Sequence, residues 1–241
     1  MSKGPLPQRL ARGTNLPALT NFPPRDSNAR ILRPGALASG AMTTPELHQR
    51  FIAIAATLSP AFARDLKALG PVNYPERADH GPEAYLARAV VGQQISSAAA
   101  RSLWGRVEAA ARASEASVHE FLARTEPAAL AACGLSRNKA KAVCAIYAAS
   151  AAEPFATLRA LDSASRRERL AAIWGIGPWT CDMMEIFYYR EPDIWPAGDL
   201  SVVRVFRSYI GRKRPAKAAS LFAPNRSLLA LYMWRLAGGL K

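Results

Sequence analysis

A two-glycine turn and an aspartate stand at close spacing in the segment from Leu170 to Asp199, where the residue types could support chemistry. Gly175 and Gly177 interrupt a helical pattern, and Pro178 suits the first position of a new helix. Glycine lets a ligand approach the backbone closely, and the free N–H groups at a helix start attract anions. A buried carboxylate at Asp199 would stabilise positive charge that develops in a reaction. The segment therefore predicts an anion site beside a catalytic carboxylate.

Each half of this pattern also has a plain structural interpretation. A glycine pair with one residue between is common as a tight turn. The residues from Asp199 to Val202 suit a helix start in which the aspartate is the N-cap. A cap and a catalytic carboxylate are compatible, and the spacing from the turn favours the catalytic role.

The elements that position these residues are expected to be helices. Alanine and leucine dominate from Thr43 onward, and no convincing strand pattern occurs. We expect an all-α fold in which residues 43–241 form one domain of two lobes with a cleft between them. Residues 1–42 are rich in Pro, Gly, Asn and Arg, and we expect a disordered basic tail there, either a solvated leader or an aid to non-specific DNA attraction. Expected helix starts are Pro45, Pro60, Pro82, the Ser96–Ser97 pair, Arg137 and Ser163 or Ser165, with three more helices after the turn.

Charge indicates a polyanionic partner. The 241 residues carry a formal net charge of +14, and the pI is about 10.3, which favours salt-sensitive attraction to nucleic acid or an anionic membrane. The longest uncharged apolar stretch, Ala142–Ala152, is too short to span a membrane, and the first ten residues lack the apolar region of a signal peptide. We expect a protein of the cytoplasm that is a monomer.

Cysteine and histidine give no metal pattern. Cys133, Cys144 and Cys181 are widely spaced without a CxxC pair, so a disulfide framework is not expected. The three histidines lack partners at zinc spacing, and we expect them at surface or cap positions. We expect no required cofactor.

Three sequence blocks, in this order, resemble the helix-hairpin-helix DNA glycosylase superfamily. They are VVGQQISSAAA at Val90–Ala100, LAAIWGIGPWT at Leu170–Thr180 followed by Pro196 and Asp199, and PNRSLLALYMW at Pro224–Trp234. Within the superfamily the chain is most similar to the AlkA-like branch, DNA-3-methyladenine glycosylase II, from about Pro82 to Gly239. Longer members carry an extra β-rich N-terminal domain, which we do not expect here. Some relatives hold an iron–sulfur cluster through four C-terminal cysteines, and no cysteine follows Cys181.

The resemblance implies base excision repair. It implies an enzyme that flips an alkylated purine, such as 3-methyladenine or 7-methylguanine, out of double-stranded DNA and hydrolyses its N-glycosidic bond. Two alternatives stay open, a glycosylase for deaminated bases such as hypoxanthine and a helix-hairpin-helix DNA-binding module without catalysis. Substitution of Asp199 separates an enzyme from a binder.

The resemblance also assigns the catalytic and pocket residues. Asp199 would face the sugar and stabilise its positive charge. Trp179 and Trp234 would form aromatic walls for the flipped base, with Met183 where relatives often have tyrosine. Each tryptophan has an alternative interpretation as an ordinary core residue. Relatives that also cut the strand have a lysine at the position of Trp179, so we expect a monofunctional glycosylase without lyase activity.

The remaining assignments concern DNA and a cation. By resemblance, Gln94 would fill the space left by the flipped base, although it could instead be a helix-terminal glutamine without DNA contact. In the family a monovalent cation is often bound by hairpin carbonyls, here those of Ala171, Ile173 and Ile176. The basic cluster Arg137, Lys139 and Lys141 could equally be a solvated helix face. The full set of expected DNA contacts is Gln93, Gln94, Ser96, Lys139, Gly175, Gly177, Thr180 and Arg226.

Overall fold

The computed structural model describes residues 44–75 and 81–238, so the expected tail at 1–42 lies outside the described residues. Within the described ranges the secondary structure is helical and contains no strand. The α-helices are α1 (Thr44–Leu58), α2 (Pro60–Leu69), α3 (Pro82–Gly92), α4 (Ser97–Ala113), α5 (Val118–Arg124), α6 (Pro127–Ala132), α7 (Arg137–Ala152), α8 (Ser163–Ala171), α9 (Pro178–Met183), α10 (Leu200–Ile210), α11 (Pro215–Ala219) and α12 (Arg226–Leu236). Two short 3₁₀ helices, η3 (Phe155–Ala160) and η5 (Ser220–Phe222), and a π-helix, η4 (Met184–Tyr189), complete the described elements.

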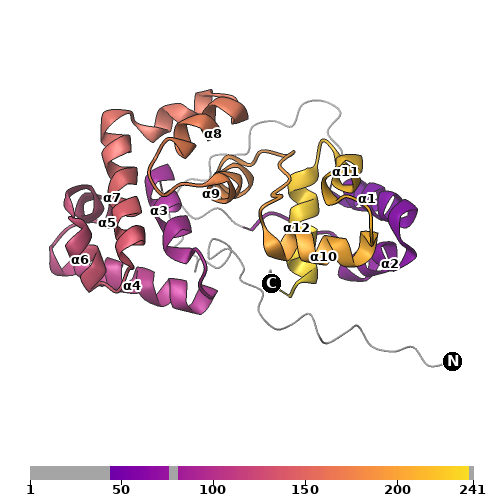
Figure 1. Ribbon diagram of the computed structural model, residues 1–241, viewed down its shortest axis with the longest axis horizontal. Helices are drawn as coiled ribbons and strands as arrows, with labels where there is room; N and C mark the ends of the chain where they lie inside the picture. Colours follow the sequence, from indigo (N-terminus) through magenta and orange to yellow (C-terminus); the bar gives the residue numbers. More distant parts are fainter. Residues whose placement is uncertain (1–43, 76–80, 239–241) are drawn as a thin grey trace.

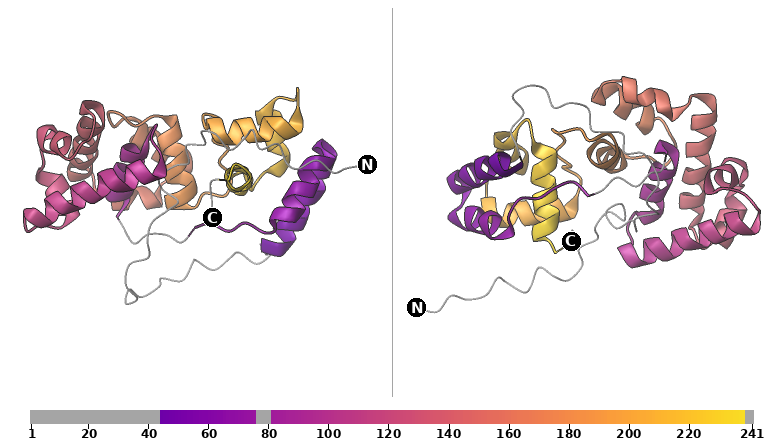
Figure 2. Two further views of the ribbon diagram at one scale, coloured as in Figure 1. Left: turned by 90° about the horizontal axis from the view of Figure 1, so that it is seen from below. Right: turned by 180° about the vertical axis from the view of Figure 1, so that it is seen from behind.

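The helices form two lobes (Figure 1). Helices α3 to α8 make one lobe, whereas α10 to α12 make the other together with α1 and α2 from the opposite end of the described chain. Helix α9 lies between the lobes, and both views in Figure 2 place α1 and α2 on the side away from α4 to α7. The expected all-α, two-lobed fold is confirmed.

In the second lobe, aromatic packing joins α1 and α2 to the later elements α10 and η5. The rings of Phe51 in α1 and Phe222 in η5 lie 5.0 Å apart between centroids, and those of Phe62 in α2 and Tyr209 in α10 lie 4.8 Å apart. His48, expected at a surface or cap position, is instead 5% exposed, and its Nδ1 lies 2.6 Å from the Tyr232 hydroxyl. Burial of such large rings stabilises this lobe.

Helix α7 is the centre of the first lobe, where it contacts α3, α5 and α6. Its many alanines allow close packing on several sides, and Ala140, Ala142 and Val143 are buried. The side chain of Ser136 accepts a hydrogen bond from the backbone N–H of Lys139 and so caps the helix. The helix starts at Arg137, as expected from the sequence, and ends at Ala152.

The expected helix starts are largely confirmed. Ser96 caps α4 by accepting from the backbone N–H of Ala99 at 3.2 Å, and α8 starts at Ser163 with Asp162 as its cap. After the hairpin, however, the chain forms α9, a π-helix, α10, α11 and α12 rather than three helices. Sequence periodicity does not predict the π-helix, because Met184–Tyr188 are buried regardless of spacing.

The described helices include none that is long and apolar enough to cross a membrane.

Candidate active site

Asp199 ends a short turn and starts α10. Its backbone N–H donates to the Pro196 carbonyl oxygen at 2.9 Å. Oδ1 accepts from the backbone N–H of Val202 at 2.9 Å, and Oδ2 accepts from Nε1 of Trp179 at 3.0 Å. Asp199 is only 4% exposed. The cap interpretation is confirmed, and the carboxylate is held in one orientation while each oxygen retains a second lone pair for another contact.

The hairpin between α8 and α9 needs glycine at one position for two reasons. Gly175 has φ +85°, and a Cβ there would lie 2.7 Å from the Cβ of Ala142 in α7. Gly177 differs, since a Cβ at that position would meet no atom within 4 Å. The first glycine therefore docks the hairpin on α7, whereas the second leaves open space in front of the start of α9.

The three expected pocket residues differ in exposure. Trp179 is half-buried, with its indole N–H turned to Asp199. Trp234 and Met183 are 0% exposed, and the Trp234 ring packs 5.3 Å from that of Phe187. The expectation that Trp234 and Met183 are open pocket walls does not fit this burial, because helical packing around α9 and α12 covers both side chains. Only Trp179 among the three presents exposed surface beside Asp199.

Gln94 occupies an exposed, backbone-restricted position between α3 and α4. Its φ is +57°, in the left-handed region that is uncommon for residues other than glycine. The neighbouring Gln93 turns inward, and its Nε2 donates to Oγ1 of Thr180 in α9 at 2.9 Å. This bond ties the loop that carries Gln94 to the first turn of α9, where Trp179 also lies.

Lys139 and Thr180 form hydrogen bonds with other residues of the protein. The Lys139 ammonium donates to the carbonyl oxygens of Val91 at 2.8 Å and Gln93 at 2.9 Å, which stabilises the end of α3. Desolvation by burial lowers its pKa. Thr180 is 1% exposed and accepts from Gln93. Both residues, which were expected to contact DNA, hold the Gln94 loop through these bonds, and Ser96 is exposed beside that loop.

Arg226 has a role that sequence reasoning did not assign. Its Nε lies 2.7 Å from Oδ1 of Asp193, a second guanidinium nitrogen lies 2.8 Å from Oδ2, and that nitrogen also donates to the Asp193 carbonyl oxygen. This bidentate pair anchors the segment that leads to Asp199. Ser227 adds a bond from its hydroxyl to the Glu191 carbonyl oxygen at 2.6 Å and accepts from the Ile194 N–H. The start of the third sequence block therefore fixes the approach to the carboxylate.

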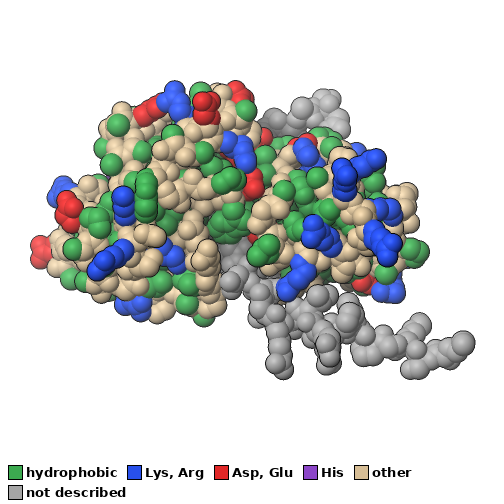
Figure 3. Space-filling view, viewed as in Figure 1, with side chains coloured by type: hydrophobic (Ala, Val, Ile, Leu, Met, Phe, Trp, Pro, Cys, Tyr) green, Lys and Arg blue, Asp and Glu red, His purple; other side chains and the backbone are tan. Residues whose placement is uncertain are grey.

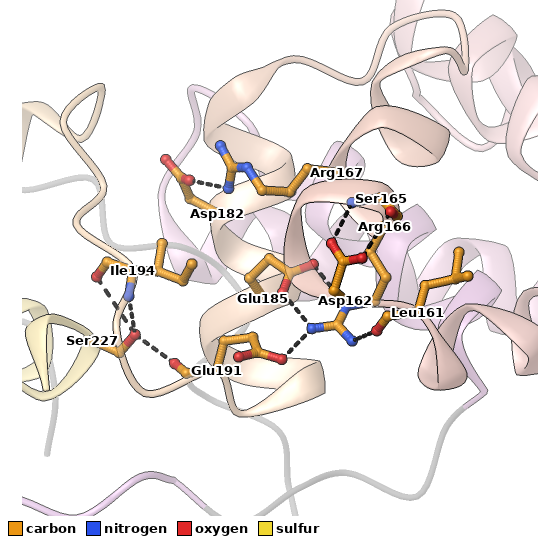
Figure 4. Close-up of polar contacts among 10 residues, drawn as sticks. All are labelled: Leu161, Asp162, Ser165, Arg166, Arg167, Asp182, Glu185, Glu191, Ile194 and Ser227. Atoms are coloured by element: carbon orange, nitrogen blue, oxygen red, sulfur yellow. Dashed lines mark hydrogen bonds and ion pairs between the residues drawn. The ribbon is translucent and has the colours of Figure 1, made fainter. Parts of the chain in front are cut away.

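A buried ion network anchors the other end of that segment (Figure 4). Two nitrogens of the Arg166 guanidinium in α8 bind the two carboxylate oxygens of Glu185 at 3.1 and 2.9 Å. Arg166 also pairs with Glu191 and lies 4.5 Å from the centroid of the Tyr189 ring. Because Glu185 is 0% exposed, removal of Arg166 would leave an unpaired buried charge. The network fixes the π-helix against α8.

Asp182, one turn after Trp179, is another buried carboxylate that sequence analysis missed. It is 6% exposed, and Oδ1 lies 2.5 Å from a guanidinium nitrogen of Arg167. Burial raises its pKa, and the pair with Arg167 acts in the opposite direction. Figure 4 shows the pair apart from the Arg166 network. Its helical spacing from Trp179 was the signal available in the sequence.

Trp174, just before the first hairpin glycine, is 43% exposed. The Lys141 ammonium lies 4.3 Å from the centroid of its ring, in cation–π contact. The exposed aromatic beside a lysine therefore borders the hairpin on its α7 side.

The cation expected at the hairpin would use the carbonyls of Ala171, Ile173 and Ile176. The Ile173 oxygen accepts from the Ile176 N–H at 3.1 Å, which leaves one lone pair for a further contact. Across the described residues, no group of three His, Cys, Asp or Glu side chains could hold a metal ion.

The chain is similar in sequence to curated glycosylases. It is 31% identical over 191 residues to DNA-3-methyladenine glycosylase 1 of Schizosaccharomyces pombe, which covers 74% of this chain and 82% of the relative. It is 23% identical over 181 residues to the alkylbase DNA glycosidase-like protein mag2 of the same yeast, covering 71% of this chain and 85% of mag2. A scan against protein-family models gives no match.

The chain is also similar in structure to solved 3-methyladenine DNA glycosylases. The S. pombe enzyme Mag1 in complex with abasic DNA superposes with a TM-score of 0.66 at 26% identity, over 80% of this chain and 96% of Mag1. A DNA-3-methyladenine glycosidase from Bacillus halodurans superposes with a TM-score of 0.65 at 26% identity, over 82% and 92% of the two chains. The two lobes and the hairpin define the helix-hairpin-helix glycosylase fold. Within that fold, the chain belongs to the DNA-3-methyladenine glycosylase family.

Proposed function

We propose that this protein hydrolyses the N-glycosidic bond of alkylated purines, such as 3-methyladenine and 7-methylguanine, in double-stranded DNA. The observation that supports this best is the buried carboxylate of Asp199, held by Trp179 and by the start of α10. The names of the relatives support the substrate class. We also propose that the protein acts as a monomer.

The proposed reaction breaks the bond between C1′ and the purine nitrogen, and the bonding electrons leave with the base. An alkylated purine is cationic, so it departs as a neutral base, and positive charge develops on the sugar. Asp199 stabilises this charge electrostatically, since a carboxylate is most effective where water is excluded. Water then adds to C1′ and loses a proton, which leaves an abasic site. Asp199 is also the candidate acceptor of that proton.

Base flipping requires a surface on which the extruded base can stack, the wall of the pocket, and a side chain that fills the space left in the duplex, the plug. Trp179 is the candidate wall, because its half-buried ring is held beside the carboxylate. Trp234 and Met183 would support the pocket from inside the core, where they are buried. Gln94 is the candidate plug, since it is exposed and its amide can bond to an orphaned base.

The hairpin is the candidate phosphate site. The open space at Gly177 would admit a phosphate oxygen to the backbone, and the exposed Gly175 turn would flank it. A monovalent cation on the carbonyls of Ala171, Ile173 and Ile176 would add positive charge there. Trp179 takes the place of the lysine found in strand-cutting relatives, which supports a monofunctional glycosylase without lyase activity.

The test is release of free bases from methylated duplex DNA, measured by chromatography beside an oligonucleotide that carries hypoxanthine. We expect release of 3-methyladenine and 7-methylguanine, with strand breaks only after heating in alkali. Faster release of hypoxanthine would assign the enzyme to deaminated bases. Duplex binding without release of any base would instead leave a DNA-binding module. A covalent complex trapped by borohydride would contradict the monofunctional mechanism.

A further inference from the structure

Positive charge is concentrated in one part of the sequence, mostly on side chains that the proposed active site does not use. Between Leu200 and Leu236 the chain has eight Lys and Arg residues and no Asp or Glu, so this stretch carries +8 of the net charge of +14. The preceding stretch, Glu153–Asp199, has five Lys and Arg residues against eight Asp and Glu. The sign of the charge therefore changes at the start of α10.

The structure places most of these cations on the outside of the second lobe. Six of them are exposed in α10, in the turn that follows it and in α11, and we call these residues the C-terminal basic surface: Arg204, Arg207, Arg212, Lys213, Arg214 and Lys217. In Figure 3 the charged side chains over α10 and α11 are mainly Lys and Arg. The surface is a feature of the folded lobe as well as of the sequence.

Few of these six cations are stabilised by contacts within the folded protein. In the described part of the chain, no ion pair joins any of the six to an acidic residue, in contrast to Arg226 with its partner Asp193. Arg207 lies in the last turn of α10, where a cation is favourable, and Lys213 donates to the Leu58 carbonyl oxygen at 3.3 Å. Arg204 lies outside the last turn of α10 and makes no such hydrogen bond, and it repels Arg207 one turn away. Such a surface is stabilised when a polyanion covers it.

We propose that the C-terminal basic surface binds the DNA backbone on one side of the damaged base and so extends the footprint beyond the pocket. This rests on the proposed function only for the choice of duplex DNA as the polyanion. Asp199 caps the first turn of α10, so the helix leads directly away from the candidate carboxylate. Its 11 residues span about 16 Å, equal to about five base pairs of duplex.

The first experiment measures the affinity of the full chain for undamaged duplex DNA as a function of salt. The first triple variant combines Arg204→Gln, Arg212→Gln and Arg214→Gln. The control triple makes the same change of charge at three exposed cations of the other lobe, Arg112→Gln, Arg124→Gln and Arg159→Gln. Each lost phosphate contact reduces the slope of log K against log salt by about 0.9. We expect the first triple to reduce the slope by about 2 to 3 and the control to leave it within about 0.5.

The second experiment shortens the duplex to about five base pairs from a damaged base, first on one side and then on the other. We expect wild type to lose affinity for only one of the two shortened duplexes, and the first triple to bind that duplex and the full one equally. Equal slopes for both triples, or equal sensitivity to both shortened ends, would overturn the proposal. Tighter binding of single-stranded RNA than of duplex DNA would overturn the choice of partner.

A thermal melt separates binding from folding, since relief of charge repulsion should leave the Tm of the first triple at or above that of wild type. If wild type releases no base but the slopes behave as expected, the proposed function fails and the basic surface stands. If base release occurs and the slopes are equal, only the basic surface fails.

Discussion

The indole N–H of Trp179 and the carboxylate of Asp199 form a hydrogen bond of 3.0 Å that joins the first turn of α9 to the first turn of α10. The two residues are twenty positions apart, and the bond fixes both the ring and the carboxylate. The hydrogen bond therefore fixes the candidate wall for the base and the candidate catalytic carboxylate relative to each other.

Trp179→Phe tests this hydrogen bond, because phenylalanine keeps a stacking surface and removes the N–H donor. A hydrogen bond to a charged group contributes about 1.5–3 kcal/mol, so we expect single-turnover base excision to slow by about 10- to 100-fold. Duplex affinity should remain close to wild type. The measurement is base release with enzyme in excess. An unchanged rate would show that the orientation of the carboxylate does not depend on this bond.

Substitution of the two hairpin glycines, Gly175 and Gly177, by alanine should have different effects. Gly175→Ala places a Cβ 2.7 Å from Ala142 at φ +85°, and we expect it to lower the free energy of unfolding by about 1–3 kcal/mol. Gly177→Ala meets no atom and should leave stability within about 0.5 kcal/mol while weakening DNA binding. Urea unfolding and duplex titration measure both effects. Equal destabilisation by both variants would contradict the distinction between docking and ligand approach.

Gln94 should affect excision more than binding. If its side chain plugs the duplex, Gln94→Ala slows base release more than it weakens the affinity for duplex DNA. Gln94→Gly is the control for backbone strain, because glycine adopts φ +57° without penalty. Both variants should lose excision alike, since both lack the amide. Recovery of the wild-type rate in the glycine variant would assign the effect to the backbone and not to the plug.

Asp182 gives a prediction for pH. Burial raises its pKa, so the folded state binds a proton more readily than the unfolded state. Its charged form opposes folding at neutral pH, and that penalty disappears as pH falls through the raised pKa toward the ordinary value. Relative to Asp182→Asn, wild type should therefore gain stability between pH 7 and pH 4, a direction measured by urea unfolding at each pH. A constant difference between the two proteins would contradict the raised pKa.

The sequence predicted the helical fold and the hairpin because their signals are local. Gly175, Pro178 and the Ser96 cap act within one or two turns of their own position, and the structure has each feature where it was expected. The N-cap role of Asp199 was equally local. Helical periodicity and capping preferences therefore predict such features from the sequence.

The sequence could not predict the partners of polar side chains across the fold. The sequence suggested a DNA contact for Lys139, and it gave no sign that the ammonium bonds to carbonyls 46 and 48 positions away. Arg226 pairs with Asp193, 33 positions away. The burial of Trp234 likewise depends on the helices that surround α12. Such contacts follow from tertiary packing, which a single sequence does not display.

The most direct test of the central claim compares wild type with Asp199→Asn in single-turnover release of 3-methyladenine and 7-methylguanine from methylated duplex DNA, with duplex affinity measured in parallel. Asparagine can still accept from the Val202 N–H, so the cap of α10 is retained while the negative charge is lost. We predict that excision falls by at least about 100-fold and that affinity stays within about threefold of wild type. Excision at the wild-type rate by Asp199→Asn would contradict the catalytic role of Asp199.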